Sequence, residues 1–342
     1  MIILAADVGG TKSNLGIFES TGGRAPGAGA SSAAAMRFER SYPTHDFPKS
    51  LASMLSQFLR EANVSAAAVS AACVGIAGPV EDGVCVAEWL PWHRVDEREV
   101  SDEAGVRGTR LINDMVATAW GVTALQPDQI VTLQAGEARA GRNVAVIAAG
   151  TGLGESALIF DDGKYHSVTC EGGHTDWAPR NPTELGLFRF LMERSDRVTN
   201  EHVIRGRGIV NVYAYFKSLE TGVVPSTLPD SDKDAGRIAQ EASANPGSAA
   251  GKAMELFVAA YGGRAGNLAM QFMATGGVYV GGGIAPKNLD RMRDGTFVRN
   301  FVAKGPLFGP ILEKIPVHVV LEQKTALIGA AQFASSHPAP DR

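Results

Sequence analysis

The segment "LAADVGGTKSNLGIF", residues 4–18, predicts a β-hairpin that turns through bare glycine beside an acidic residue. Two strands, expected at 2–8 and 13–19, flank a turn formed by Gly9, Gly10 and Thr11. Because glycine has no side chain, backbone N–H groups at such a turn can converge on an anion, and phosphate is the natural ligand. Asp7 would repel bare phosphate, so its place indicates a Mg²⁺ ion between the carboxylate and the phosphate, held mainly through water. The hairpin therefore predicts a site for a metal nucleotide.

The composition is that of an ordinary globular protein and excludes several classes. Of 342 residues, 45% are hydrophobic and 20% are charged, which is enough for two domains with cores of their own. The net charge of −4 provides no basic surface for a nucleic-acid backbone, so we expect a small ligand and no nucleic-acid partner. No run approaches the roughly 18 apolar residues of a membrane span, and the first residues lack the pattern of a signal peptide. We therefore expect no membrane association.

The cysteines favour a reducing compartment. Cys73, Cys85 and Cys170 lie far apart and form no C-x-x-C pair, which argues against a disulfide framework and against a structural zinc site. With no signal peptide expected, the predicted location is the cytoplasm.

Strands alternate with helices along the chain, which predicts an α/β fold. Apolar residues at helical spacing indicate a helix over 46–60, with Asp46 as its cap and Pro48 in its first turn. Buried strands are expected at 69–77 and 110–113, and a helix over 115–125 follows the second at once. The second half predicts helices near 182–195, 200–219 and 248–273, strands at 277–282 and 317–322, and a last helix at 325–336. Residues 20–35, rich in Gly and Ala, are predicted to be a flexible connection.

The segment "VAVIAAGTGLGESALIF", residues 144–160, repeats the strand, glycine turn and strand of residues 2–18. Two such hairpins, one in each half, predict a duplicated α/β unit whose turns face each other over a cleft, and chance similarity is the alternative. Residues 152–157 fit the loose G-x-G-x-x-A pattern of dinucleotide-binding folds, but residues 158–160 resemble a strand where that fold requires a helix. No G-x-x-x-x-G-K-[ST] phosphate loop is present in the sequence.

A second group of polar residues suits a ligand with several hydroxyl groups. The group consists of Asn113, Asp114, Glu171, His174 and Glu201. Because open α/β sheets bind ligands at the carboxyl ends of their strands, Asp114 is a candidate general base that accepts the proton of an attacking hydroxyl. Three of these residues also have a structural alternative. Asp114 could cap the next helix, His174 could be a buried core residue, and Glu201 could be an acid in the first turn of a helix capped at Asn200.

Taken in order, these motifs resemble those of the bacterial glucokinases outside the repressor-kinase family, within the sugar kinase, actin and heat-shock ATPase superfamily. "DVGGT" at 7–11 is similar to that family's first phosphate motif, "LIND" at 111–114 to its catalytic segment, and "AGTGLG" at 149–154 to its second phosphate motif. "EGGHTDWAP" at 171–179 resembles the sugar-binding block and is the most specific match, and "VYVGGGIAP" at 278–286 is similar to the adenosine motif. The resemblance covers nearly the whole chain and implies a two-lobed, duplicated ribonuclease-H-like (actin-like ATPase) fold with a central cleft.

The resemblance implies a glucokinase that transfers the γ-phosphoryl group of MgATP to the 6-hydroxyl of glucose. In that family pattern Asp114 is the catalytic base, and Asp7 holds the hydrated Mg²⁺. The residues implied for sugar binding are Asn113, Asp114, Gly152, Glu171, His174 and Glu201. Those implied for ATP binding are Asp7, Gly9, Gly10, Thr11, Lys12, Gly150, Thr151, Gly152, Gly281, Gly282 and Gly283. A homodimer is also implied, with a small domain of residues 1–112 and 323–342 and a large domain of residues 113–322.

Two departures from the family pattern leave alternatives open. Lys12 stands where the family often has Asn, and it could reach a phosphate or be an exposed turn lysine. Trp89 stands near the place where relatives tend to have Asn, so a kinase for another hexose or an amino sugar is an alternative. A non-catalytic sugar sensor is another, as is a glycosidase that uses Asp114 and Glu171, although a glycosidase would give the glycine turns no role. The phosphoryl donor, among ATP, ADP and polyphosphate, is open too.

Overall fold

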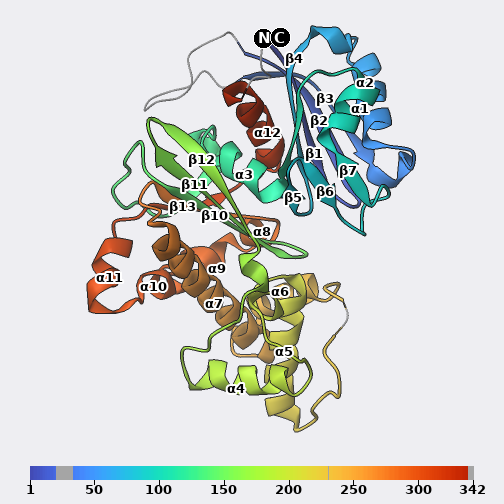
Figure 1. Ribbon diagram of the computed structural model, residues 1–342. Coiled ribbons are helices and arrows are strands. Elements are labelled where there is room, and N and C mark those ends of the chain that lie inside the picture. Colours follow the sequence, from blue (N-terminus) through green and yellow to red (C-terminus); the bar gives the residue numbers. More distant parts are fainter. Residues whose placement is uncertain (21–33, 230, 338–342) are drawn as a thin grey trace. The chain divides into compact units, whose positions relative to one another are not determined.

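The computed structural model describes residues 1–20, 34–229 and 231–337 and shows a mixed α/β protein (Figure 1). The strands are β1 (Ile2–Val8), β2 (Lys12–Glu19), β3 (Ala35–Pro43), β4 (Val69–Ile76), β5 (Val80–Glu81), β6 (Val84–Val86), β7 (Arg94–Asp96), β8 (Thr109–Asn113), β9 (Ile130–Gln134), β10 (Val144–Ala149), β11 (Leu153–Asp161), β12 (Lys164–Cys170), β13 (Gly277–Gly281) and β14 (Val317–Val320). The helices are α1 (Leu51–Glu61), α2 (Glu97–Ala104), α3 (Asp114–Val122), α4 (Pro182–Met192), α5 (Gly206–Thr221), α6 (Ala235–Ala244), α7 (Ala249–Phe272), α8 (Ile284–Lys287), α9 (Leu289–Arg293), α10 (Thr296–Val302), α11 (Gly305–Leu312) and α12 (Thr325–Ser336). The expected α/β class is confirmed. Of the expected flexible connection, residues 21–33 lie outside the described part of the chain.

The two larger sheets repeat one strand order. The first runs β3-β2-β1-β4-β8, and the second runs β12-β11-β10-β13-β14 with β9 added at its end. In the first sheet β1 pairs antiparallel with β2 and parallel with β4, and in the second β10 and β13 pair in parallel. The two hairpins that look alike in sequence, β1–β2 and β10–β11, therefore occupy the same place in their sheets. This arrangement confirms the expected duplicated fold and disfavours chance similarity. A small third sheet has the order β5-β6-β7.

The chain divides into two compact units, each with a hydrophobic core of its own. The first unit comprises residues 1–129, 156–169 and 322–342, and the second comprises residues 130–155 and 170–321. Among the helices of the described residues, none is long and apolar enough to cross a lipid bilayer.

In the first unit, helices cover both faces of the first sheet (Figure 1). Alternate apolar residues of β1 join a core that includes the buried face of α1. On the other face, α12 packs against α3, β1 and β4. This packing requires glycine at 329, because a Cβ there would lie 1.7 Å from the carbonyl oxygen of Ala117 in α3. The close contact holds α12 against α3, the helix whose first residue is the expected catalytic Asp114.

The helix α1 begins later than the sequence predicts. The expected cap was Asp46, but Asp46 ends a separate 3₁₀ turn, and Pro48 lies ahead of α1 instead of in its first turn. Ser50 is the cap, and its Oγ accepts the Ser53 N–H at 3.1 Å. The expectation was wrong because Ser50 is in reach of an N–H that lacks a helical partner, whereas Asp46 is one turn too far upstream.

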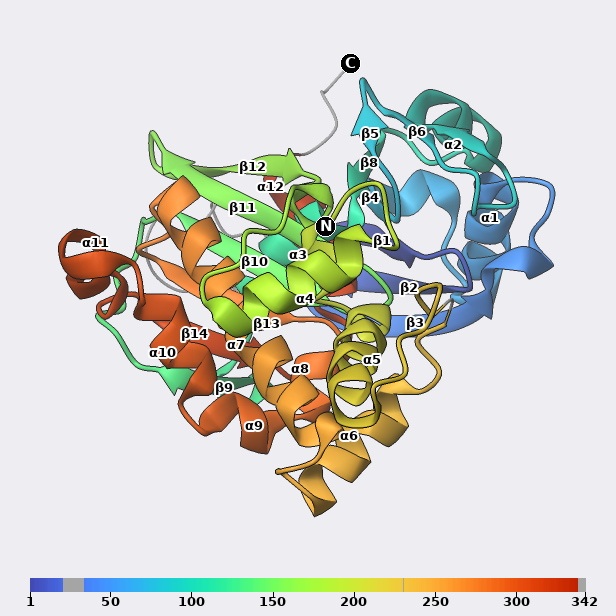
Figure 2. The same ribbon diagram turned by 90° about the horizontal axis from the view of Figure 1, so that it is seen from below.

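In the second unit, α7 is the central helix and is buried along most of its length. It packs against α5, α6 and α10 (Figure 2). The helix expected over 200–219 was wrong at its start, because α5 begins at Gly206 and residues Asn200–His202 form the separate 3₁₀ helix η5. Glu201 is therefore not in the first turn of a helix capped at Asn200. The other helices and strands expected in this half are present, with small shifts at their ends.

Candidate active site

The carboxyl ends of three parallel strands meet at one edge of the first sheet. β4 lies between β1 and β8, and the registers align Asp7 with Gly75 and Gly75 with Ile112. Asp7, near the end of β1, and Asn113, the last residue of β8, therefore stand at the same edge with one strand between them. This is the edge at which open α/β sheets bind their ligands.

Asp7 is a partly buried carboxylate at this edge. Its Oδ2 accepts the Nδ2–H of Asn14 at 3.3 Å, and Ser41 orients that amide by donating to its Oδ1 at 2.7 Å. Burial raises the pKa of Asp7, while the Asn14 hydrogen bond and the Lys12 charge act to lower it. The described residues hold no group of three or more His, Cys, Asp or Glu that could bind a metal ion. A cation at Asp7 would thus be held by one carboxylate together with waters and ligand oxygens, an arrangement that Mg²⁺ takes beside nucleotides.

The first glycine turn, residues 9–12, is held by its own backbone and by Thr44. The Gly9 N–H donates to the Lys12 carbonyl at 3.0 Å, and Thr44 Oγ1 donates to the Gly9 carbonyl at 2.7 Å. Thr11 and Lys12 are exposed. A Cβ at Gly10 would meet its nearest atoms at 3.4 Å, an ordinary contact, so the fold alone does not require glycine there. Thr44 was missed by the sequence reasoning because nothing in the local pattern connects it to a turn more than thirty residues away.

The helix α3 begins at the end of β8 with two polar residues. Asn113 is its N-cap: its Oδ1 accepts the Met115 N–H at 2.9 Å, while its Nδ2 donates to the Gly78 carbonyl at 3.0 Å. Asp114 follows in the first turn, is partly buried, and its Oδ1 accepts the same N–H at 2.9 Å. The alternative in which Asp114 is the cap is therefore wrong. The first turn of a helix favours a negative charge, which suits an ionised carboxylate at this edge.

The second glycine turn lines a pocket of about 900 Å³ that lies wholly in the second unit. Gly150 and Thr151 of this turn and Gly283, which follows β13, contribute to one lining. A Cβ at Gly150 or at Gly283 would meet nothing within 4 Å, so the fold does not require glycine at either place. The rest of the lining includes Gly206, Ile209, Asp232, Gln240, Ile284 and Asn288. A concave, mixed apolar and polar lining beside bare backbone is typical of a site for a nucleoside phosphate.

A buried tyrosine ties together the two strands that lead into this pocket. Tyr261 of α7 is fully buried, and its hydroxyl accepts the Ala149 N–H at 3.0 Å. The carbonyl oxygens of Ile147, at 3.2 Å, and of Gly281, at 3.3 Å, are the two acceptors within reach of its single proton. Gly282 follows with φ of +79°, and a Cβ there would lie 2.3 Å from the Ala149 carbonyl oxygen. Gly282 is therefore required by the fold, unlike Gly283. The sequence analysis did not identify Tyr261, although buried tyrosine hydroxyls usually form a hydrogen bond.

The 171–174 turn, which contains the 3₁₀ helix η4 (Gly172–His174), lies directly on the beginning of β11. A Cβ at Gly173 would lie 2.1 Å from the Leu153 carbonyl oxygen, and one at Gly172 would lie 1.8 Å from Glu155 Oε2. No side chain fits at either glycine. These two residues bring the turn into contact with the strand and with the Glu155 carboxylate.

A buried ion pair supports the turn. Glu155 is almost fully buried in β11, and Arg264 of α7 binds it through two hydrogen bonds, Nε to Oε1 and Nη2 to Oε2, each 2.6 Å long. The Arg264 Nη2 also lies 3.5 Å from the Gly172 carbonyl oxygen. Two parallel, charge-assisted hydrogen bonds fix both side chains. The signal that could have revealed this pair is a lone glutamate inside the apolar run of residues 153–160.

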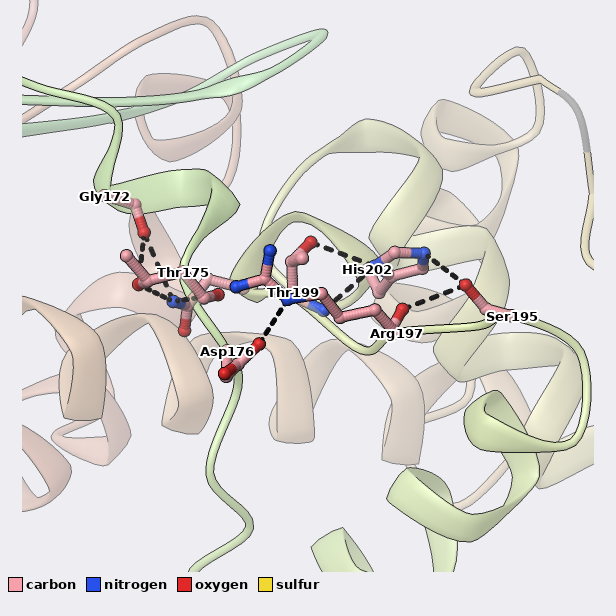
Figure 3. A network of polar contacts seen from close by, with 8 residues as sticks. Gly172, Thr175, Asp176, Ser195, Arg197, Thr199 and His202 are labelled. Carbon is pink, nitrogen blue, oxygen red and sulfur yellow. Dashed lines mark hydrogen bonds and ion pairs between the residues drawn. The ribbon is translucent and has the colours of Figure 1, made fainter.

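The 3₁₀ helix η5 (Asn200–His202) holds the end of the same turn (Figure 3). Asn200 Nδ2 donates to the carbonyl oxygens of Gly172 at 3.3 Å and of Thr175 at 3.0 Å. His202 in turn fixes η5, because its Nδ1 accepts the Thr199 N–H at 3.1 Å. The amide of Asn200 therefore binds the 171–174 turn instead of capping a helix.

Three residues expected to bind the sugar, Glu171, His174 and Glu201, lie in the turn and in η5, which the preceding contacts hold in place. Glu171 and His174, at the two ends of the turn, are exposed, so the alternative of His174 as a buried core residue is wrong. Glu201 is buried: its Oε1 accepts the Leu153 N–H at 2.8 Å, and its Oε2 accepts an Nη1–H of Arg205 at 2.8 Å. Since each carboxylate oxygen has a further lone pair, Glu201 can still accept a hydroxyl.

Each unit thus brings one part of the expected residues together. In the first unit, the carboxyl edge of the sheet carries Asp7, the first glycine turn, Asn113 and Asp114. In the second unit, Gly150, Thr151 and Gly283 line one pocket, and the 171–174 turn and Glu201 meet at the beginning of β11. Gly152 adjoins this second group, since a Cβ there would lie 2.9 Å from Glu201 Oε1.

Comparisons with known proteins agree with one another. The glucokinase family model matches residues 4–337. Among curated relatives, the glucokinase of Trichormus variabilis is 36% identical over 98% of this chain and 99% of its own length. The glucokinase of Synechocystis sp. is 35% identical over 97% of each chain.

Solved structures give the same fold. A glucokinase from an Antarctic psychrotroph superposes with a TM-score of 0.84 at 26% identity, over 98% of this chain and 99% of that one. A ROK-family glucokinase from Streptomyces griseus, solved with glucose and AMPPNP, gives a TM-score of 0.61 at 20% identity, over 98% of this chain and all of that one. The second likeness concerns the fold alone.

Proposed function

We propose, from the premise that the chain belongs to the glucokinase family, that it transfers the γ-phosphoryl group of MgATP to the 6-hydroxyl of glucose. The observation that carries this proposal is the open space at Gly150 and Gly283, two glycines that the fold itself does not require and that line one pocket. A bound phosphate at close range to the backbone is a physical reason for their lack of side chains. The product would be glucose 6-phosphate.

Phosphoryl transfer requires mainly positioning and charge neutralisation, and both units offer groups for it. In the second unit, Gly150, Thr151 and Gly152 would contact phosphate through the backbone, and Gly281, Gly282 and Gly283 would let the adenine approach the main chain. In the first unit, the backbone of Gly9, Gly10 and Thr11 would do the same. Lys12 is exposed beside Asp7 and would add a positive charge near the phosphates.

Asp7 is the residue that would hold Mg²⁺, mainly through water. When bound, the metal neutralises charge on the phosphate oxygens and orients them. Asn14 and Ser41 fix the direction of the Asp7 carboxylate and therefore where the cation would lie.

Asp114 would accept the proton of the 6-hydroxyl as its oxygen attacks phosphorus. Asn113 shares the same helix start and would orient the neighbouring hydroxyls through its amide. Glu171, His174 and Glu201 would bind the remaining hydroxyls, and Gly152 would let the sugar approach the backbone. The exposed side chains of Glu171 and His174 extend from a turn that the Glu155–Arg264 pair holds in place.

A coupled assay across sugars and donors tests the proposal. Glucose, mannose, fructose and glucosamine would each be offered with ATP, ADP or polyphosphate, with Mg²⁺ and with EDTA. We expect the highest kcat/KM for glucose with ATP and Mg²⁺. A higher value for another sugar would favour the alternative hexose or amino-sugar kinase that Trp89 suggests. Sugar binding without turnover would instead favour a sensor, and nucleotide-independent cleavage of glycosides would favour a glycosidase.

Three further expectations from the resemblance are part of the proposal. These are a homodimer, a cytoplasmic location, and a division into residues 1–112 with 323–342 and residues 113–322. Light scattering of the purified protein tests the dimer, and mass mapping of limited proteolysis products tests the division. Fractionation of the native cells tests the location.

A further inference from the structure

Trp89 is an exposed side chain that the first unit nevertheless holds in one position. Of its surface, 56% is exposed, yet its Nε1–H donates to the Ala77 carbonyl at 2.9 Å. Its Cδ1 lies 3.4 Å from where a Cβ at Gly10 would stand, and its Cζ2 lies 3.6 Å from where one at Gly78 would stand. The indole ring therefore lies between the first glycine turn and the residues that follow β4.

The same segment after β4 also holds Asn113. The carbonyl of Gly78 accepts the Nδ2–H of Asn113 at 3.0 Å, and Asn113 caps the helix whose first residue is Asp114. Trp89 and the catalytic segment are thus joined through two adjacent residues, Ala77 and Gly78, and the first glycine turn contacts the Trp89 ring itself. All of them belong to the first unit, so this arrangement does not depend on where the second unit lies.

The chemistry of the ring limits what it can bind. Its indole N–H is engaged by the Ala77 carbonyl, so the side chain of Trp89 offers a ligand no hydrogen-bond donor and cannot recognise a phosphate. What it offers is an aromatic face, which attracts the partly positive C–H groups of an apolar surface. A pyranose ring has such a C–H face. A nucleoside base would also stack, but the pocket at Gly150 and Gly283 in the second unit already provides a place for it.

We propose that the exposed face of Trp89 packs against the C–H face of the hexose whose 6-hydroxyl gives its proton to Asp114. Trp89 is then a specificity-determining residue. The inference rests on the proposed function. Because the ring is anchored, little side-chain entropy is lost when the sugar binds. An aromatic face makes no hydrogen bond to a ring substituent, so Trp89 favours a sugar by the shape of its apolar face and not by its polar groups.

The test measures glucose binding without nucleotide, by calorimetry and by tryptophan fluorescence. Trp92→Phe is the matched control, because Trp92 lies in the same segment and its Nε1–H also donates to a backbone carbonyl, that of Phe47, at 2.6 Å. We expect glucose to change the emission of the wild type and of Trp92→Phe, and this change to be lost in Trp89→Phe. In Trp89→Ala the Kd and KM for glucose should rise about tenfold, since stacking and burial together contribute about that factor. The KM for ATP should stay unchanged.

Two results would overturn the inference. One is an unchanged glucose Kd in Trp89→Ala together with a glucose-dependent emission change that survives in Trp89→Phe. The other is a raised KM for ATP with an unchanged KM for glucose, which would assign the ring to the nucleotide. Circular dichroism tests whether both variants fold. If Trp89→Ala does not fold, Trp89→Phe, which keeps an aromatic ring at this position, still gives the fluorescence test. Wild-type protein that neither binds nor phosphorylates glucose would overturn the proposed function itself.

Discussion

The first glycine turn and the 171–174 turn both place glycine next to a carboxylate, yet they use it in opposite ways. At the first turn, a Cβ at Gly10 would make ordinary contacts, and the nearby Asp7 carboxylate is bound by the neutral amide of Asn14. At the 171–174 turn, Gly172 lies against Glu155, whose charge Arg264 balances at 2.6 Å. Gly10, which the fold does not require, leaves the first turn open to a ligand, whereas Gly172, which the fold requires, holds the 171–174 turn against its support.

The contrast divides the candidate site into groups that act on a ligand and groups that hold them in place. Carboxylates of the first kind, Asp7 and Asp114, are partly exposed at the edge of a sheet. Glu155 is of the second kind, because it is almost fully buried behind Gly172 and two short hydrogen bonds fix it to Arg264. Substitutions in the two groups should therefore affect different measurements.

The largest effect should come from Asp114→Asn. An amide cannot accept the hydroxyl proton, so we expect kcat to fall about 10²–10⁴-fold with little change in thermal stability. The coupled assay and thermal unfolding measure the two quantities. Asp102→Asn, at an exposed acid of α2 in the same unit, is the control and should keep full activity. Near-normal turnover of Asp114→Asn would remove the assignment of the base.

The Glu155→Gln variant should show the opposite pattern. It leaves the Arg264 charge buried without its partner, so the free energy of unfolding should fall by about 3–5 kcal/mol. Urea unfolding measures the loss, and the double variant Glu155→Leu with Arg264→Met should regain part of it. Glu220→Gln, which breaks the exposed Lys217–Glu220 pair, is the control and should cost little. If Glu155→Gln and Glu220→Gln lower the free energy of unfolding equally, the supporting role of the buried pair is contradicted.

A pair of glycine substitutions should separate the two kinds of turn. Gly172→Ala would place a methyl group on the Glu155 carboxylate, so the free energy of unfolding should fall by about 1–3 kcal/mol. Gly150→Ala meets open space, so stability should change by less than about 0.5 kcal/mol while the KM for ATP rises. Urea unfolding and steady-state kinetics give both values. If Gly150→Ala costs as much stability as Gly172→Ala, the distinction between the turns is wrong.

Asp7→Asn should differ from the other variants by a gain in the stability of the metal-free protein. Burial raises the pKa of Asp7 above its ordinary value of 3.8, so the protonated form favours the folded protein. That contribution is present below the ordinary pKa and is lost as the pH rises through the folded pKa, so ionised Asp7 destabilises the metal-free protein at pH 7. Asparagine carries no charge to bury. We expect the variant to be more stable than the wild type in EDTA and to have lost Mg²⁺-dependent activity.

The pH dependence of the stability difference between Asp7→Asn and the wild type is a control for this last prediction. The stability difference between Asp7→Asn and the wild type should be larger at pH 7 than at pH 5, because fewer wild-type molecules are ionised at Asp7 in the more acidic buffer. A variant that is less stable than the wild type at pH 7 would show that the Asp7 charge is compensated within the fold.

The sequence alone determined the elements whose pattern is local. The strands expected at 2–8 and 13–19 are β1 and β2, and the repeat at 144–160 is the hairpin at the matching place of the second sheet. Alternating apolar residues and glycine turns act on neighbouring residues, so they can be interpreted without a fold. The starts of α1 and α5 were misplaced, because several polar residues could cap each helix and the backbone around them decides which one does.

Only the tertiary structure decided what holds the candidate site together. Glu155 and Arg264 lie 109 residues apart in the chain. Tyr261 accepts a hydrogen bond from the Ala149 N–H, 112 residues away, and Asn200 donates one to the Gly172 carbonyl, 28 residues away. Such contacts arise when separate elements pack, and no local pattern encodes which of the buried polar groups will meet. The sequence determined which residues could react with a ligand, and packing determined which residues keep them in position.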